Sequence, residues 1–253
     1  MRASPVSTVL GVHVDALAWR AALESITRWM EERSAGDTPR IAARHVVTLN
    51  PEMVMAARVD SSLRAIIQAA DLVVPDGAGV VWALRRAGAR QVERIPGVDL
   101  LVALAERAAG RGWRVFLLGA APGVAEEVAR RLRARFPGLA IAGTYAGEPA
   151  ITEDAHQAAL VRASQAGMLF VAYGTPAQER WIARNRERLG AVVAIGVGGA
   201  FDLLAGRVLR APLWMRRAGM EWAYRLWRQP WRWRRMLALP RFALAVLFTR
   251  SPS

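Results

Sequence analysis

Four short segments, each placed just after an apolar run, hold the residue types that could bind or transform a ligand. In residues 74–79 (VPDGAG), Asp76 stands at the end of an apolar run beside a flexible glycine turn. Spacing alone favours a helix N-cap for this acid over a role in chemistry. In residues 48–52 (TLNPE), Asn50 suits a helix cap and a ligand contact equally well, and Pro51 fits a first helical turn. Both segments can therefore present polar groups to a ligand.

The other two segments suit phosphates and sugars. Residues 118–123 (LGAAPG) are small, and small residues let a backbone approach a diphosphate at a helix N-terminus. The full dinucleotide fingerprint is missing there, and tight packing also favours small residues. In residues 173–179 (YGTPAQE), Gln178 can hydrogen-bond a base, sugar or phosphate, whereas Glu179 can simply favour a helix N-terminus. The four segments thus predict contacts to phosphates and sugars, with no catalytic triad.

The absence of several motifs argues against certain metal sites and enzyme classes. The three histidines, His13, His45 and His156, show no metal-ligand spacing, and without any Cys the sequence predicts no zinc site. No D-x-D motif offers ligands for a divalent cation on a nucleotide diphosphate. A Walker loop and a G-x-S-x-G elbow are also missing, which argues against an ATPase and a serine hydrolase. We therefore expect no metal and no cofactor, and positive charge that comes from the protein itself.

Short apolar runs alternate with longer amphipathic segments along the chain, and this order must position the four segments. Near-continuous apolarity is typical of strands that are covered on both faces. Such strands are predicted at 46–49, 72–74, 115–118, 139–142, 169–172 and 192–195. Helices are predicted at 98–109, 122–135, 153–165 and 177–188. The pattern predicts an α/β, Rossmann-like fold with a mainly parallel sheet and helices on both faces, whose ligands collect at the carboxyl ends of the strands.

The last part of the chain is basic and rich in tryptophan. Residues 207–253 hold eleven arginines and one acid, Glu221, and so carry a formal charge of +10 out of +14 for the whole chain. Five of the ten tryptophans lie among these arginines, at Trp214, Trp222, Trp227, Trp231 and Trp233. Such a surface suits phosphates and lipid headgroups, although a basic helical pair packed on the body is a simpler alternative. We therefore divide the chain into a core, residues 1–206, and a C-terminal helical appendage, residues 207–253.

The longest apolar stretch, residues 236–248, lies inside this appendage. It contains Pro240 and Arg241, and it is shorter than the roughly 20 apolar residues that span a bilayer. The stretch is therefore predicted to be an interfacial helix that associates with a membrane surface. Near the N-terminus, Asp15 and neighbouring polar residues interrupt any apolar run, so no signal peptide is predicted.

Seven motifs stand in a specific order along the chain. They are 48–51 (TLNP), 75–79 (PDGAG), 94–99 (RIPGVD), 174–179 (GTPAQE), 196–202 (GVGGAFD), 210–212 (RAP) and 221–226 (EWAYRL). On these motifs the sequence, from about residue 8 to residue 240, resembles the WecG/TagA/CpsF glycosyltransferases. The resemblance implies an inverting, metal-independent enzyme that moves a hexose from a UDP-sugar to an undecaprenyl-diphosphate-linked sugar. Such an enzyme lies on the cytoplasmic face of the cell membrane, and its products feed wall teichoic acid, enterobacterial common antigen or exopolysaccharide synthesis.

The resemblance also assigns expected roles to residues. Asp76 is the expected general base, which takes the proton of the acceptor hydroxyl as that oxygen attacks the anomeric carbon. The appendage is expected to cover the site, where its arginines stabilise the leaving diphosphate without a metal. The expected substrate-binding residues are Thr48, Asn50, Arg94, Gly97, Gln178, Arg225, Arg232 and Arg235, and backbone geometry adds Gly119 and Gly198.

Several alternatives remain open at this point. N-acetylmannosamine is the favoured sugar, with UDP-glucose or UDP-N-acetylmannosaminuronic acid in exopolysaccharide assembly as alternatives. Arginines interleaved with aromatic residues also suit single-stranded nucleic acid, although we expect no nucleic-acid partner. A nicotinamide-dependent enzyme would need a fuller glycine fingerprint and an acid after the second strand. Self-association as a homo-oligomer is compatible with the apolar appendage, and membrane binding could then release active monomers.

Overall fold

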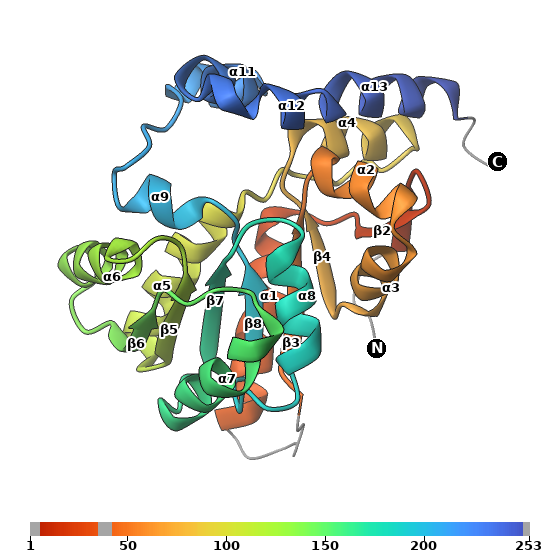
Figure 1. The fold of residues 1–253 in the computed structure, drawn as a ribbon. Helices are drawn as coiled ribbons and strands as arrows, with labels where there is room; N and C mark the ends of the chain where they lie inside the picture. Colours follow the sequence, from red (N-terminus) through yellow and green to blue (C-terminus); the bar gives the residue numbers. More distant parts are fainter. Residues whose placement is uncertain (1–5, 35–41, 250–253) are drawn as a thin grey trace.

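Six parallel strands form the central sheet, in the order β4-β3-β8-β7-β5-β6 (Figure 1). The computed structural model describes residues 6–34 and 42–249. The strands are β3 (Arg44–Leu49), β4 (Leu72–Pro75), β5 (Arg114–Gly119), β6 (Ala140–Tyr145), β7 (Met168–Ala172) and β8 (Val193–Gly196). Each of the six predicted apolar runs overlaps one of them, so the predicted parallel sheet is confirmed. The last strand in sequence, β8, lies in the middle of the sheet, between β3 and β7.

A two-stranded antiparallel hairpin, β1 (Val6–Val9) and β2 (Val12–Asp15), stands beside this sheet. Asp15, the last residue of β2, accepts a hydrogen bond from the backbone N–H of Val73 in β4 at 2.8 Å. Asp15 is buried, and this hydrogen bond links the hairpin to the sheet.

Helices cover both faces of the sheet, as predicted. One face packs against α1 (Trp19–Ser34), α5 (Gly97–Arg111), α6 (Val124–Arg135) and α9 (Ala200–Leu204). The other face packs against α2 (Pro51–Val59), α3 (Ser61–Ala69), α4 (Ala78–Arg86), α7 (Asp154–Ala163) and α8 (Ala177–Asn185), with a 3-10 turn, η1 (Ile151–Glu153), before α7. Neighbouring residues of a strand point to opposite faces of the sheet. In β3, Val46 packs in the core on the side of α1 and α5, and Val47 packs in the core on the side of α2, α3 and α4. This double burial is the reason that the strands read as continuous apolar runs.

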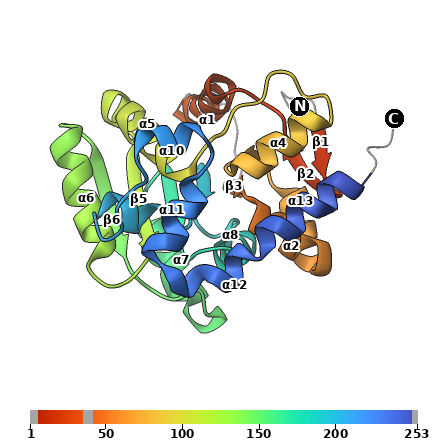
Figure 2. The ribbon, with the colours of Figure 1, turned by 90° about the horizontal axis from the view of Figure 1, so that it is seen from above.

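The C-terminal segment crosses above the carboxyl ends of the strands as a series of short helices (Figures 1 and 2). These are α10 (Leu213–Arg217), α11 (Glu221–Arg228), η2 (Pro230–Arg232), α12 (Trp233–Met236) and α13 (Ala238–Phe248). The last helix is docked on the core, because Phe242 and Val246 are buried with residues of α2 and α4. Among the described residues, no helix has the length and apolarity that a membrane crossing requires. The segment is helical as expected, while its division from the core at residue 206 stays a prediction.

Candidate active site

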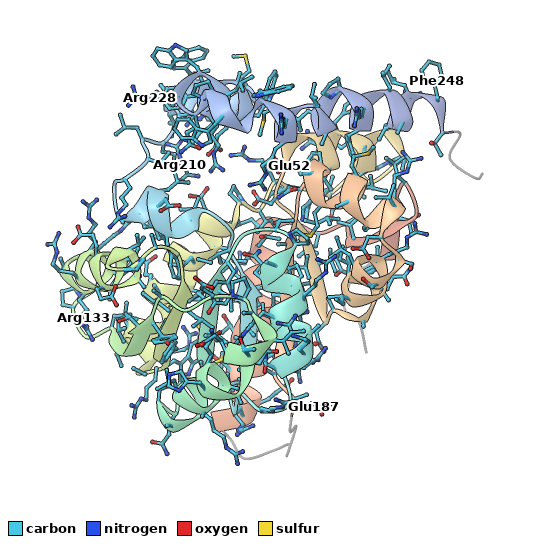
Figure 3. The ribbon with its side chains drawn as sticks, in the orientation of Figure 1. Glu52, Arg133, Glu187, Arg210, Arg228 and Phe248 are labelled. Atoms are coloured by element: carbon cyan, nitrogen blue, oxygen red, sulfur yellow. The ribbon has the colours of Figure 1, made fainter. Side chains whose placement is uncertain are left out.

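A cavity of about 1260 Å³ lies between the carboxyl ends of the strands and the C-terminal helices. Its floor is made by the segments that follow β3, β4, β7 and β8, and its roof by residues of α11, α12 and α13. Arg210 and Glu52 lie in the region between the C-terminal helices and the strand ends (Figure 3). Ligands of open parallel sheets bind at this edge, so the cavity is the candidate active site.

Asp76 lies in this cavity directly after β4. It does not cap α4: Gly77 occupies the N-cap position, so the helix-capping role that spacing favours is wrong. The carboxylate instead accepts a hydrogen bond from the backbone N–H of Gly97, at the start of α5. Burial raises the pKa of Asp76 from 3.8 to about 6, and the nearby Arg225 and Arg94 limit that rise. A carboxylate with this pKa is ionised at neutral pH and is still a useful base.

Close packing requires a glycine, Gly77, directly after Asp76. A Cβ at this position would lie 2.5 Å from Cδ of Pro51, in the first turn of α2. The turn after β4 therefore packs directly on the segment after β3, and this contact holds Asp76 beside Asn50 and Thr48 in the same cavity.

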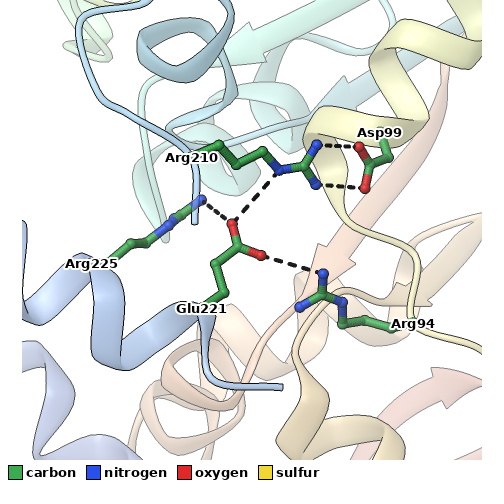
Figure 4. Close-up of polar contacts among 5 residues, drawn as sticks. All are labelled: Arg94, Asp99, Arg210, Glu221 and Arg225. Carbon is green, nitrogen blue, oxygen red and sulfur yellow. Dashed lines mark hydrogen bonds and ion pairs between the residues drawn. The ribbon is translucent and has the colours of Figure 1, made fainter. Parts of the chain in front are cut away.

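An arginine cluster surrounds Glu221, the first residue of α11 (Figure 4). One Glu221 oxygen lies 3.3 Å from Nη2 of Arg94, and the other lies 3.3 Å from Nη2 of Arg225 and 4.0 Å from Nε of Arg210. Arg210 also makes a bidentate pair with Asp99, at 2.5 and 2.6 Å. The cluster thus joins the core, through Arg94 and Asp99, to the C-terminal segment.

Three predicted ligand residues are engaged with the protein itself. The hydroxyl of Thr48 donates to the carbonyl oxygen of Gly196 at 2.7 Å, and Oδ1 of Asn50 caps α2 by accepting from Met53 N–H at 2.9 Å. Gln178 is fully buried, and its Oε1 accepts from Gly198 N–H at 2.8 Å. All three residues line the cavity, and their described hydrogen bonds hold the loops that form it.

Glu179, the residue after Gln178, is fully buried, although an acid in the first turn of a helix can favour that helix while it is exposed to water. Its Oε2 lies 2.6 Å from Nε2 of His45 on β3, and its Oε1 accepts from Nε2 of Gln178 at 2.9 Å. A chain of polar contacts therefore runs from β3 through Glu179 and Gln178 to the backbone of Gly198. His45 thus pairs with a buried carboxylate, and Glu179 supports the floor of the cavity.

The remaining predicted residues divide into those that line the cavity and those that do not. Gly97, Gly198 and Arg235 line it, and Arg235 pairs with Glu52 at 2.8 Å. Gly119 is not among the lining residues; its φ is +101°, and a Cβ there would lie 2.9 Å from the backbone of Ala172, so packing against β7 accounts for this glycine. The backbone of Arg232 belongs to η2, and its side chain lies outside the described part of the structure.

Glu221, Arg210 and Asp99, which the structure brings together, were not predicted from the sequence as functional residues. Glu221 is nevertheless visible in the sequence, as the single acid among the eleven arginines of residues 207–253 and as the first residue of the motif at 221–226. Across residues 6–34 and 42–249, no group of three or more His, Asp or Glu side chains is arranged to hold a metal ion.

Comparisons with known proteins agree on one family. The model of the glycosyl transferase WecG/TagA/CpsF family matches residues 7–253. An N-acetylglucosaminyldiphosphoundecaprenol N-acetyl-beta-D-mannosaminyltransferase of Bacillus spizizenii is 40% identical over 202 residues, which cover 80% of this chain and 78% of that protein. A Bacillus subtilis protein with the same name is 38% identical over the same shares of both chains.

Proposed function

The chain belongs to the WecG/TagA/CpsF family of glycosyl transferases, and on that premise we propose that it transfers N-acetylmannosamine from a UDP-sugar to an undecaprenyl-diphosphate-linked N-acetylglucosamine. The names of the two Bacillus relatives support this sugar and this acceptor. The transfer inverts the anomeric carbon and needs no metal. The product would serve a cell-surface polymer such as a teichoic acid.

Asp76 is the proposed general base. It takes the proton from the acceptor hydroxyl, whose oxygen forms a bond to the anomeric carbon while the bond from that carbon to the UDP oxygen breaks. The observation that carries this role is the position of a buried carboxyl with a pKa of about 6 in a cavity lined by arginines. A lower pKa would make the carboxylate a weaker base, and a much higher one would leave it protonated at neutral pH.

The arginines are the proposed substitute for a metal ion. As UDP leaves, negative charge grows on its diphosphate, and guanidinium groups can stabilise this charge because they keep their protons and bind phosphate oxygens in pairs. Arg94, Arg225 and Arg235 line the cavity and come from both the core and the C-terminal helices. Arg232 is proposed for the same role from its place in the sequence.

The test of this function is UDP release by the purified protein in detergent, with and without a polyprenyl-diphosphate-linked N-acetylglucosamine. We expect acceptor-dependent release with UDP-N-acetylmannosamine, unchanged by a metal chelator. Acceptor-dependent release with only UDP-glucose or UDP-N-acetylmannosaminuronic acid would show that the donor is this other UDP-sugar and that the reaction is still a glycosyl transfer. No release with any of the three donors would contradict the proposal.

We further propose that residues 207–253 form an appendage that covers the site and holds the enzyme on the inner face of the cell membrane. Trp227 and Trp231 are 73% and 72% exposed, although tryptophan is usually well buried. Tryptophan favours the headgroup layer, and basic residues near an anionic membrane each contribute about 1 kcal/mol. The formal charge of +10 in this segment suits that surface.

Vesicle binding tests the membrane contact. We expect the protein to float with vesicles that contain phosphatidylglycerol, and to bind them about tenfold more weakly when Trp227 and Trp231 are both replaced by Ala, because two interfacial anchors are lost. The matched control is Ile151→Ala, which removes an apolar side chain that is 74% exposed on η1. Equal vesicle binding by the wild type and the double variant would contradict this membrane contact.

A further inference from the structure

We propose that Glu221 is a positioning residue of the transfer, whose carboxylate holds Arg94 and Arg225 in the empty site and releases them to the diphosphate of the donor. This inference rests on the proposed function, because the diphosphate is that of the UDP-sugar.

The distances indicate that Glu221 is a displaceable partner. Its contacts with Arg94 and Arg225 are 3.3 Å long, whereas charge-assisted hydrogen bonds between nitrogen and oxygen are usually about 2.7–2.9 Å. Asp99 binds Arg210 at 2.5 and 2.6 Å in the same cluster. The structure therefore contains one tight pair, which fixes Arg210, and one carboxylate that is shared loosely among three guanidinium groups.

Arg210 has a hydrogen-bond donor, Nε, on the side that faces the Glu221 carboxylate. Its Nε is buried and has no hydrogen-bond partner in the described structure, because Asp99 takes only Nη1 and Nη2. The nearest Glu221 oxygen is 4.0 Å from this nitrogen, which is too far for a hydrogen bond. A phosphate oxygen that replaced the carboxylate could accept from this donor.

The charges favour the exchange. Asp99 pairs with Arg210, and Glu221 is the carboxylate that pairs with both Arg94 and Arg225, which the buried Asp76 also faces. A diphosphate carries more negative charge than a carboxylate and offers several oxygens to paired guanidinium donors. Because Glu221 is largely buried in the wall of the cavity, its charge opposes the entry of this anion with little screening by water.

Glu221 also acts on the proposed base. Asp76 is faced by Arg94 from the segment before α5, by Glu221 and Arg225 from α11, by Arg210 from the segment before α10, and by the N–H of Gly97. Burial is the main cause of the raised pKa of Asp76, and the negative charge of Glu221 raises it further. Removal of that charge should therefore lower the pKa of Asp76.

The test is Glu221→Gln, which removes the charge and keeps the shape. We expect calorimetric titration to show UDP and pyrophosphate each binding about fivefold more tightly, because their anionic competitor is gone. We expect kcat to fall about tenfold, because the arginines are no longer held in place. The acidic limb of the pH–rate profile should move to lower pH. A residue that merely docked α11 would weaken UDP binding and leave the pH limb in place.

Two further variants complete the experiment. Glu221→Asp keeps the charge and should retain the UDP affinity and pH limb of the wild type, even where its shorter side chain lowers kcat. Glu24→Gln removes a second i,i+4 pair with arginine, on the exposed face of α1, and should change none of these values. UDP affinity that is equal or weaker in Glu221→Gln would overturn the inference. If neither protein binds UDP but pyrophosphate binds the variant more tightly, the anion exchange stands and the proposed donor is wrong.

Discussion

Asp76→Asn lowers kcat by about 10³-fold, within the range usual for loss of a general base, while UDP still binds. The amide keeps the size of the side chain but cannot accept the proton of the acceptor hydroxyl. Turnover is measured as acceptor-dependent UDP release, and UDP affinity by titration calorimetry. Activity equal to that of the wild type would remove Asp76 from the role of base. Loss of UDP binding together with activity would instead assign it to donor binding.

The pH dependence of the wild type is the companion measurement. The pKa of Asp76 is raised by burial to about 6, so this proposed base would become protonated and inactive as the pH falls through 6. We expect kcat/KM to be level between about pH 7 and 8 and to fall about tenfold for each pH unit well below 6. An acidic limb near pH 4, the value of an unperturbed carboxyl, would contradict this environment for Asp76.

Glu179→Ala lowers the free energy of unfolding by about 3 kcal/mol, since each buried polar group left without a partner costs about 1–3 kcal/mol. The substitution removes the partner of His45 and one partner of Gln178, and all three side chains are inaccessible to water. Urea unfolding followed by circular dichroism measures the change. The control is Glu187→Ala, which removes an exposed carboxylate just after α8 and should shift stability by less than about 0.5 kcal/mol. Similar unfolding midpoints for both variants would show that the buried pair contributes little.

The strands of the large sheet could be predicted because burial on both faces leaves a run of apolar residues in the sequence. Five strands of the large sheet, β3, β4, β5, β7 and β8, have buried residues on both faces, which produces the apolar runs that the sequence displays, whereas the edge strand β6 is only partly buried. The hairpin formed by β1 and β2 was not predicted. Its strands have only four residues each, and a tertiary contact between Asp15 and Val73 connects it to the sheet.

The candidate site was predictable in its location and less so in its contacts. Motifs at the ends of strands placed Asp76 and Gln178 correctly at one edge of the sheet. The partner of each side chain depends on segments that are distant in sequence: Gly97 for Asp76, and Gly198 for Gln178. Residue spacing carries no information about such partners, which is why Glu221 stood out in composition without receiving a role.

The central position of β8 has a consequence for the order in which the protein can be built. During synthesis, β4 with β3 and β6 with β5 and β7 can pair as two separate groups, and the strand that joins them emerges last. Until Val193–Gly196 leaves the ribosome, the inner edges of β3 and β7 have no partner from this sheet. Unpaired strand edges promote association between chains, so a ribosome that stalls before this strand releases an aggregation-prone product. Completion of the sheet thus falls late in translation, shortly before Arg225 and Arg235, which are proposed to bind the diphosphate.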